Sequence, residues 1–462
     1  MKKYWLFDSA VKRSTNGAKV IPGQLKKDSR NPLFGEGFRT DPALPWENQI
    51  GNGYPNVFYD PLIRKYRCYY TSYLTADPAE TDSLPRQEYK AKEKRITAIL
   101  YAESEEGIRW VKPSLGAVEY RGSRDNNIIA LHTHGAGVLF DTEERDPKKR
   151  YKIISRDDRG PLNIHAAFSA DGIHFSGWRP VIDDPLYPGD THNFVIRDRL
   201  SGKYLLYTRS FLRELRMEVR LVSDDFIHWS EGQPALCGTD ADEQIYGMPV
   251  FWQDELYWGL AEIFYAGDSA KAHYDHVEVE LCYSGDGVRW QRVAPGIPFI
   301  PNGGPGSYDF GCCYASAPIF NGLDFRFYYM GGSGTHYSLK ETGLCLGTVS
   351  RERLAGVTSE NGDAFTYQTR KLRTRSQKMT VCADVTGGEI CYELLDEDGE
   401  TIPGFSADEC APITESNEAA PLRWNGRSGD FPKDPFMVRF SCDHAVLYSI
   451  SGDIELLPCH PM

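Results

Sequence analysis

The chain has 462 residues and a formal net charge of −13, with 25% charged and 41% hydrophobic residues. The acidic balance argues against nucleic acid as a partner, because phosphate binding needs a basic surface and no Lys/Arg-rich tract is present. No segment approaches the ~20 apolar residues of a membrane span. The start, MKKYWLFDSAVKR, is not expected to act as a leader peptide, because Asp8 and Lys12 interrupt its apolar residues. We therefore expect neither nucleic acid nor membrane as a partner.

The aromatic and cysteine contents bear on fold class and compartment. Aromatic residues make up 13% of the chain, with 27 Tyr and 9 Trp. Such rings pack well on pleated sheets, and they also stack on sugar faces. The 11 cysteines are an odd number without CxxC spacing, which predicts neither a disulfide framework nor a zinc site. A β-rich protein in a reduced, cytoplasmic compartment is expected.

An internal repeat of the form Ser-x-Asp-Gly-Ile-x-Trp runs through most of the chain. Its clear copies, SEEGIRW, SADGIHF, SDDFIHW and SGDGVRW, begin at Ser104, Ser169, Ser223 and Ser284, and a worn copy begins at Ser350. The Asp-Gly pair predicts a tight turn, because glycine adopts positive φ without steric cost. The apolar and aromatic residues that follow are expected to start an outer strand that packs on the sheet.

A second element alternates with this repeat: a short apolar strand, a polar turn and an aromatic-rich strand. It occurs at 57–70, 138–154, 194–207, 249–260 and 318–330. The period of roughly 55 to 80 residues suits four short strands with their loops. The alternation predicts a five-bladed β-propeller. The alternative is an array of β-sandwiches with coincidental turns.

The pattern changes after about residue 356. Strands joined by Gly-Gly and Asp-Gly turns follow at 379–405 and 423–450 and predict a C-terminal β-sandwich. The expected fold is therefore all-β, with a catalytic propeller domain over 1–356 and a sandwich domain over 357–462. The N-terminal stretch from Tyr4 to Val11 is expected either to complete the propeller as a closing strand or to lie against the sandwich.

The repeats, together with the motifs PWEN, YAESEEGIRW, GSRDNN and ELLDEDGETIPGF, resemble the five-bladed propeller enzymes of glycoside hydrolase families 43 and 32. They are most similar to a large, poorly characterised bacterial group that is labelled family-32-like. The resemblance covers nearly the whole chain and implies a propeller followed by a sandwich. The Asn-Asp-Pro-Asn-Gly and Glu-Cys motifs of family 32 are absent, and Arg197-Asp198 falls at a hairpin turn, which argues against a fructosidase.

Residues that lead into the first strand of each propeller blade point at the mouth of the central axis, and here they are acids, amides, imidazoles and aromatic rings. Ahead of the five expected blades stand, in turn, Trp46, Glu47 and Asn52; Asp125, Asn126, Asn127, His132 and His134; Asp190, His192 and Asn193; Asp242, Glu243 and Tyr246; and Tyr308 and Asp309. Gathered carboxylates raise each other's pKa, so a ring of acids predicts a function.

The resemblance implies a base or nucleophile on blade 1, a stabilising acid on blade 3 and a general acid on blade 4. By position these are Glu47, Asp190 and Glu243. Each also has a structural interpretation: a loop carboxylate bonded to backbone amides, a turn former and a solvated loop acid, respectively. Family 43 has Asp on blade 1, so Asp8 and Asp41 stay open as alternatives there. Glu262 is the chief rival as the acid, because a Glu inside the apolar run WGLAEIFY needs a partner or a function.

The remaining candidates are expected to bind substrate, with Trp46 and Tyr308 as stacking platforms. The full set is Trp46, Asp125, Asn127, His134, His192, Asn193, Tyr246, Glu262, Tyr308, Asp309 and His336. Arg124, Arg209 and Arg220 either supply charge to an acidic substrate or balance the acidic ring.

The histidines suggest a second hypothesis, in which His132, His134, His192 and His336 hold a divalent ion with Asp190. A His-x-His on a strand puts both rings on one face, and imidazole with carboxylate is a reasonable ligand set. We favour hydrogen bonds from these histidines to sugar hydroxyls or to the carboxylates. No metal and no cofactor are expected.

The sequence therefore predicts a glycoside hydrolase that removes a terminal sugar from small, imported oligosaccharides or glycosides by paired-carboxylate catalysis. The alternatives are a metal-dependent hydrolase, such as a sugar deacetylase, on the same propeller, and a non-catalytic carbohydrate-binding propeller. The expected partner is a small carbohydrate, and assembly into a homo-oligomer stays open.

Overall fold

The chain is built from β-strands. The computed structural model describes residues 2–36, 44, 46–74, 96–160, 163–362, 364–425 and 431–458. The helices in these ranges are short 3₁₀ turns, η1 (Pro147–Lys149), η2 (Arg351–Arg353) and η3 (Ala407–Glu409). The predicted all-β class is therefore confirmed for the described residues.

The strands form two compact units. The larger comprises 25–292 and 298–348, and the smaller comprises 1–24, 293–297 and 349–462. These bounds differ from the predicted domains, 1–356 and 357–462, because the first strands of the chain pair with strands near its end.

The larger unit contains a series of antiparallel sheets that follow one another along the chain, here numbered 1 to 5. Sheet 1 consists of β5 (Glu47–Gln49), β6 (Asn56–Asp60), β7 (Lys65–Leu74), β8 (Ile96–Ser104) and β9 (Ile128–Leu131). Sheet 2 consists of β10 (Thr133–Phe140), β11 (Tyr151–Asp157), β12 (Asn163–Ser169) and β13 (Ser176–Ile182). Sheet 3 consists of β14 (Phe194–Arg197), β15 (Tyr204–Leu212), β16 (Leu215–Ser223) and β17 (Gln233–Cys237).

Sheets 4 and 5 are joined through one parallel pair, Val277 with Cys312. Sheet 4 consists of β18 (Glu243–Ile245), β19 (Val250–Gln253), β20 (Leu256–Tyr265), β21 (Val277–Ser284) and β22 (Gln291–Arg292). Sheet 5 consists of β23 (Cys312–Ala315), β24 (Ile319–Phe320), β25 (Asp324–Gly332), β26 (Thr342–Ser350) and β4 (Lys26–Lys27). Strand β4 precedes sheet 1 in the chain, so a segment from the start of the unit completes its last sheet.

Buried apolar clusters link each sheet to the next. Sheets 1 and 2 share a cluster that includes Tyr69 and Ile153. Other clusters join sheet 2 to sheet 3 and sheet 3 to sheet 4. A further cluster contains Tyr70 of sheet 1, Phe264 of sheet 4 and Tyr328 of sheet 5. The apolar packing therefore returns from the last sheets to the first.

The Ser-x-Asp-Gly repeat forms the turns that follow β8, β12, β16 and β21, and at Gly107 and Gly172 a tyrosine of another sheet binds the turn. The hydroxyl of Tyr69 in sheet 1 donates to the Gly172 carbonyl in sheet 2 (2.8 Å), and Tyr328 in sheet 5 donates likewise to Gly107 in sheet 1 (2.8 Å). A Cβ on Gly172 would lie 2.7 Å from the Tyr69 Oη, so this position excludes larger residues. The predicted turns are confirmed, and they also hold neighbouring sheets together.

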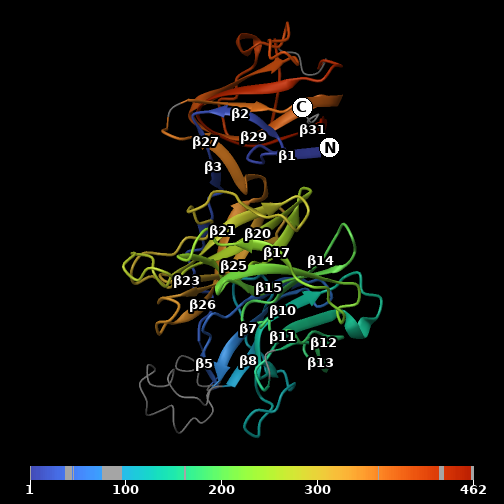
Figure 1. Ribbon diagram of the computed structural model, residues 1–462, viewed down its shortest axis with the longest axis vertical. Coiled ribbons are helices and arrows are strands. Elements are labelled where there is room, and N and C mark those ends of the chain that lie inside the picture. Colours follow the sequence, from blue (N-terminus) through green and yellow to red (C-terminus); the bar gives the residue numbers. More distant parts are fainter. Residues whose placement is uncertain are drawn as a thin grey trace. The chain divides into compact units, whose positions relative to one another are not determined.

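The smaller unit is an eight-stranded sheet built from both ends of the chain (Figure 1). Its strands are β1 (Lys2–Trp5), β2 (Lys12–Asn16), β3 (Ala18–Pro22), β27 (Ala355–Ser359), β28 (Phe365–Thr369), β29 (Leu372–Leu395), β30 (Asn417–Pro421) and β31 (Met437–Leu456). Of the two alternatives for Tyr4–Val11, pairing with the C-terminal segment is observed, because β1 pairs with β31. Register shifts interrupt the long pairing of β29 with β31.

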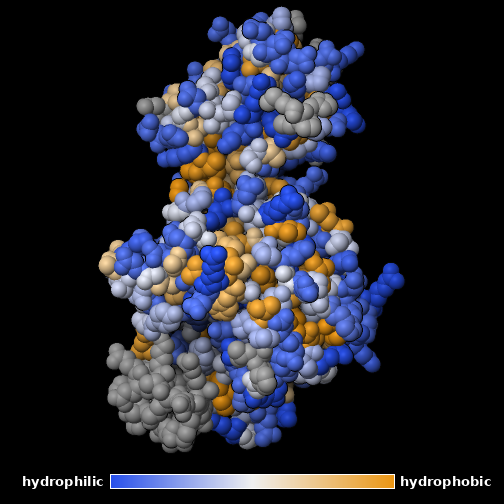
Figure 2. Space-filling model, viewed as in Figure 1, coloured by the Kyte–Doolittle hydropathy of each residue, from blue (hydrophilic) through white to orange (hydrophobic). Residues whose placement is uncertain are grey.

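The surface in Figure 2 carries mainly hydrophilic side chains with scattered apolar ones. Cysteines in the described ranges, Cys68 among them, are free thiols. No helix within the described part of the chain has the length and apolarity that crossing a bilayer requires.

Candidate functional site

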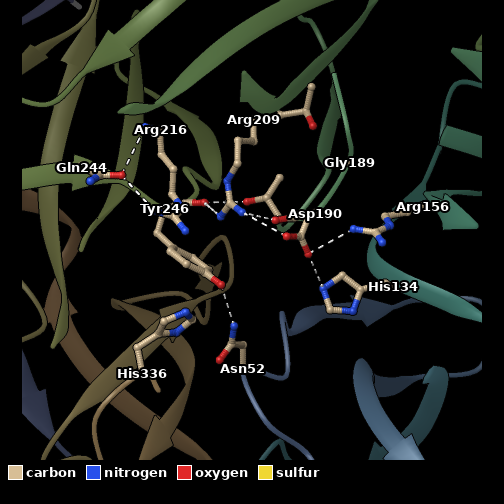
Figure 3. Close-up of polar contacts among 12 residues, drawn as sticks. Asn52, His134, Arg156, Gly189, Asp190, Arg209, Arg216, Gln244, Tyr246 and His336 are labelled. Carbon is tan, nitrogen blue, oxygen red and sulfur yellow. Dashed lines mark hydrogen bonds and ion pairs between the residues drawn. The ribbon is translucent and has the colours of Figure 1, made fainter. Parts of the chain in front are cut away.

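Asp190 is the centre of a charged cluster in the larger unit (Figure 3). It lies in the loop before β14, and its side chain is 55% exposed. Its Oδ1 is 3.3 Å from His134 Nε2 and 3.4 Å from Arg156 Nη1, and its Oδ2 is 3.7 Å from Arg209 Nη1. Partial burial acts to raise the pKa of Asp190, but the contact with His134 and the charges of Arg209 and Arg156 hold it well below its usual range. The carboxylate is therefore ionised at neutral pH.

Arg209 connects this loop to the turn that follows β18. Its side chain is 2% exposed, and it donates to the backbone carbonyl oxygens of Asp190 and Tyr246, the latter at 2.8 Å. Thr191 Oγ1 donates to the same Tyr246 carbonyl at 2.6 Å. A single buried cation thus fixes the position of both segments.

Aromatic rings flank the cluster. The Tyr54 and Tyr246 rings are nearly parallel with centroids 6.4 Å apart, and Asn52 Nδ2 donates to the Tyr246 hydroxyl at 2.9 Å. The His336 ring lies edge-on to Tyr246 at 4.8 Å, and the His134 ring lies edge-on to Tyr54 at 5.5 Å. The Tyr54 and Tyr246 rings are buried in an apolar cluster, so they form a packed support for the polar groups around Asp190.

Two buried glutamates lie close to Arg209. Glu262 on β20 is fully buried; its Oε1 accepts from the Ala315 N–H at 3.0 Å, and its Oε2 has no hydrogen-bond partner among the described residues. Burial raises the pKa of Glu262 to about 8, although the Ala315 N–H and the charge of Arg209 act to lower it. Burial also raises the pKa of Glu218 well above its usual range, with Arg209 opposing and Glu262 reinforcing the shift. Both groups are therefore protonated at neutral pH.

Glu262 reaches close to the Asp190 loop. A Cβ placed on Gly247 would lie 2.8 Å from Glu262 Oε2 and 3.3 Å from Thr191 Oγ1. Because Gly247 has no side chain, the acid lies beside the residue that follows Asp190. The site thus places the protonated Glu262 near Thr191, the residue that follows the ionised Asp190, and acid–base catalysis requires one carboxyl group in each state.

The loop that carries Asp190 is fixed by buried polar contacts. Asn193 donates to the carbonyl oxygens of Gly135 (2.7 Å) and Gly189 (2.9 Å), and Thr208 Oγ1 donates to Asn193 Oδ1 (2.7 Å). Gly135 has φ +59°, and a Cβ there would collide with the Thr191 carbonyl oxygen. Asn193, a predicted substrate ligand, is therefore occupied within the protein.

Of the three predicted catalytic residues, Asp190 is in this cluster and Glu47 is in another. Glu47 begins β5 and is fully buried, and it accepts from the Tyr70 hydroxyl and pairs with Lys112 Nζ, both at 2.5 Å. Asn127 and Trp46 belong to the same network. Asn127 Nδ2 donates to the Tyr70 hydroxyl, and Trp46 Nε1 donates to Asn127 Oδ1 at 3.0 Å. These contacts correspond to a buried ion pair within sheet 1 and its loops.

The other predicted acids also lie outside the Asp190 cluster. Glu243 pairs with Arg292 at 2.6 Å. Asp309 is buried, pairs with Lys27 at 2.6 Å and accepts from the Tyr329 hydroxyl at 2.9 Å. Two predicted substrate ligands also lie outside the Asp190 cluster. Tyr308 Oη accepts from Asn31 Nδ2 at 3.2 Å, and Asp125 is exposed on its loop. Asp8 belongs to the smaller unit, and Asp41 lies outside the described residues.

The four histidines of the metal hypothesis do not converge. His134 contacts Asp190, whereas His336 Nδ1 contacts the Tyr314 hydroxyl at 3.0 Å. His192 is fully buried with Nε2 3.3 Å from Asn56 Oδ1, and burial lowers its pKa to about 3. His132 lines a separate cavity. Among the described residues, no three His, Cys, Asp or Glu side chains are placed to hold a metal ion.

Sequence reasoning missed Glu218, Arg156 and Tyr54. Glu218 lies in the apolar strand LRMEVRLVS, and the rule that identified Glu262, an acid inside an apolar strand, applies to it equally. Arg156 pairs in register with His134 across β10 and β11, and this register is a tertiary feature that the linear pattern does not contain.

Comparison with known proteins finds similarity in fold and not in sequence. No family profile matches the chain, and no curated protein matches its sequence. The β-1,2-mannobiose phosphorylase of Listeria innocua superposes with a TM-score of 0.50 at 12% identity, over 71% of this chain and 98% of that one.

Two further solved structures have a TM-score of 0.48 at 14% identity. An N-acetylgalactosamine deacetylase from F. plautii covers 75% of this chain and 97% of its own, and a GH62 α-L-arabinofuranosidase from Coprinopsis cinerea covers 71% and 98%. The superposition on the mannobiose phosphorylase shows a shared fold, and the similarity at this identity concerns the fold alone.

Proposed function

We propose that the five sheets of the larger unit are the blades of a five-bladed β-propeller and that the smaller unit is a sandwich domain. The cyclic series of apolar clusters supports the propeller, since the last sheets share a cluster with the first. The bond from Tyr328 in sheet 5 to the turn at Gly107 in sheet 1 supports it further. Strand β4 would be the closing strand of blade 5.

We infer that the chain is a carbohydrate-active enzyme that cleaves a terminal glycosidic bond. The observation that carries this proposal is that Asp190 is ionised and Glu262 is protonated, with the charge of Arg209 acting on the pKa of both. Glycoside cleavage needs one carboxylic acid to protonate the leaving oxygen and one carboxylate to act as base or nucleophile. Asp190 is the exposed, ionised group of the pair.

Glu262 is the proton donor in this proposal. Its carboxyl group lies against Gly247, which has no side chain to separate the acid from the Asp190 loop. Glu47 and Glu243, which the family resemblance implies as base and acid, take part in ion pairs with Lys112 and Arg292 instead. A small sugar or oligosaccharide as substrate and a cytoplasmic location are part of the same proposal.

The test is a screen of aryl glycosides and natural oligosaccharides, with and without inorganic phosphate. We expect hydrolysis that does not depend on phosphate and that falls by roughly 100-fold or more in Asp190→Asn and Glu262→Gln. The matched control is Asp224→Asn, whose carboxylate is 79% exposed and pairs with Lys203; it should leave turnover unchanged.

Other results would contradict the proposal in distinct ways. Cleavage that requires phosphate would identify a phosphorylase, and chelator-sensitive release of acetate would identify a metal-dependent deacetylase. Sugar binding without any turnover would identify a binding protein.

A further inference from the structure

A cavity lies against sheet 2, on the face opposite to His134. It has a volume of about 460 Å³, and its lining includes Trp178, Phe175, Asp157, Arg159, His165 and His132. Volumes of this size are typical of sites for small molecules.

The strand register separates this cavity from the Asp190 cluster. On β10 and β11, His134 pairs with Arg156 and the adjacent Thr133 pairs with Asp157. Successive side chains of a strand point to opposite faces. His134 and Arg156 contact Asp190, whereas Thr133 and Asp157 line the cavity. The two sites are therefore on opposite faces of one ladder, and one small ligand cannot fill both.

The polar side of the cavity is a compact set of charges. Asp157 accepts from Arg159 Nε (3.0 Å) and Nη2 (2.7 Å), and its Oδ2 is 3.3 Å from His165 Nδ1. The hydrogen bond from Arg159 outweighs burial and lowers the pKa of Asp157 to about 2, while burial lowers the pKa of His165. At neutral pH the carboxylate and the guanidinium therefore cancel, and the imidazole is uncharged.

The apolar side consists of ring surfaces. Phe175 and Trp178 are partly buried and pack on the cluster that joins sheets 1 and 2. Between the two sides His132 links β9 to β10 with φ +57°, a conformation that glycine adopts without strain. Two hydrogen bonds hold the His132 backbone. Its N–H donates to the Thr97 carbonyl (2.7 Å), and its carbonyl accepts from the Asp158 N–H (2.9 Å). An imidazole is thus presented to the cavity at a conformational cost.

We propose that this cavity is a second, non-catalytic binding site for an uncharged sugar ring, stacked on Trp178 and hydrogen-bonded at its hydroxyls to Arg159, His165 and His132. The paired charges of Asp157 and Arg159 leave hydrogen-bonding groups without a lone charge on that side, and aromatic rings together with such groups match a pyranose, which has an apolar face and a polar edge. The proposal does not depend on catalysis at Asp190.

Binding is measured by calorimetry and by tryptophan fluorescence with neutral monosaccharides and disaccharides, in an Asp190→Asn background that prevents turnover at the other site. We expect saturable binding of at least one neutral sugar that weakens about tenfold or more in Trp178→Ala. Arg159→Gln should weaken it as well, and because that guanidinium is 61% exposed the substitution tests the site even where Trp178→Ala fails to fold. Leu323→Ala, at a side chain 82% exposed elsewhere, is the matched control.

Two results would overturn the proposal. One is that neutral sugars bind with affinities that both variants leave unchanged. The other is that only acidic sugars bind at Trp178. Absence of glycosidase activity would count against the proposed function alone, because this assay needs no turnover.

Discussion

The guanidinium of Arg209 lies 4.4 Å from the centre of the Tyr246 ring and donates to the carbonyl oxygen of the same residue at 2.8 Å. The cation is therefore held by both the ring and the backbone of Tyr246, where it also contacts Asp190. This fixed charge favours ionisation of Asp190, whereas burial raises the pKa of Glu218 and Glu262 in spite of the same charge.

Removal of this cation should change the pH dependence of turnover. In Arg209→Gln the pKa of Asp190 rises, because a neighbouring positive charge is lost, so the acidic limb of kcat/KM moves to higher pH. Loss of the backbone contacts should also lower kcat/KM about tenfold or more. Arg179→Gln, at an exposed position, should reproduce neither effect. An unchanged acidic limb in Arg209→Gln would mean that Asp190 does not control it.

Glu262 should make the free energy of unfolding fall as the pH rises. Its pKa is raised from 4.5 to about 8, so the folded state keeps a proton that the unfolded state releases above pH 4.5. Stability is full below pH 4.5 and falls by up to about 1.4 kcal/mol per pH unit as the pH rises to 8. Glu262→Gln should remove this slope in urea unfolding measured from pH 4 to 9. Exposed Glu231→Gln should keep it, and a slope that persists in Glu262→Gln would place its origin elsewhere.

His192 should make the free energy of unfolding fall at acid pH, the opposite direction to the effect of Glu262. Burial lowers its pKa from 6.5 to about 3, so below pH 6.5 the unfolded state takes up a proton that the folded state refuses. Stability is full above pH 6.5 and is lost as the pH falls towards 3. Denaturant titrations should show that the difference in the free energy of unfolding between wild type and His192→Gln shrinks as the pH falls over this range. His228→Gln, at a side chain 87% exposed, is the control and should behave as wild type.

Glu47→Gln should lower the free energy of unfolding and leave turnover nearly unchanged. The substitution leaves Lys112, whose side chain is 10% exposed, without its counter-charge, which typically costs about 3–5 kcal/mol. Glu47→Gln/Lys112→Met should recover part of the loss, and kcat/KM of the folded Glu47→Gln protein should stay within a few-fold of wild type. Normal stability with abolished turnover would instead support the catalytic role that the family resemblance implies.

The bond between neighbouring sheets at Gly172 can be tested against a glycine without such a contact. Gly172→Ala introduces a Cβ 2.7 Å from the Tyr69 hydroxyl and strains a residue with φ +76°. Gly177→Ala has similar backbone strain at φ +72° but nothing within 4 Å of its Cβ. Thermal unfolding should show the larger loss in Gly172→Ala, by about 1–3 kcal/mol. Equal losses would show that the contact contributes nothing.

Much of the fold was predictable because its signals are local. The Ser-x-Asp-Gly turns depend on positive φ at glycine and on the serine hydroxyl, which in the second copy accepts from the Gly172 N–H at 3.0 Å. The position of residues 2–22 was not decided by the sequence, since β1 pairs with a strand that lies near the opposite end of the chain.

The candidate site was only partly predictable. Asp190, His134 and Tyr246 were expected near one another because each stands ahead of an expected inner strand, and Figure 3 shows them together with His336. Glu47 and Glu243 were expected with them, but the linear pattern cannot tell a carboxylate that faces a ligand from one that meets Lys112 or Arg292.

The sequence by itself determined the all-β class of the described residues, where the repeated turns lie and which polar residues stand ahead of the repeated hairpins. These features follow from backbone sterics and from the alternation of side chains along a strand, both of which act over a few residues. Only the tertiary structure decided which acids are ionised, which are protonated and which are paired. The pKa of a carboxyl group depends on burial and on charges within a few ångströms, and here those neighbours, such as Arg209 for Asp190 and Lys112 for Glu47, come from distant parts of the chain.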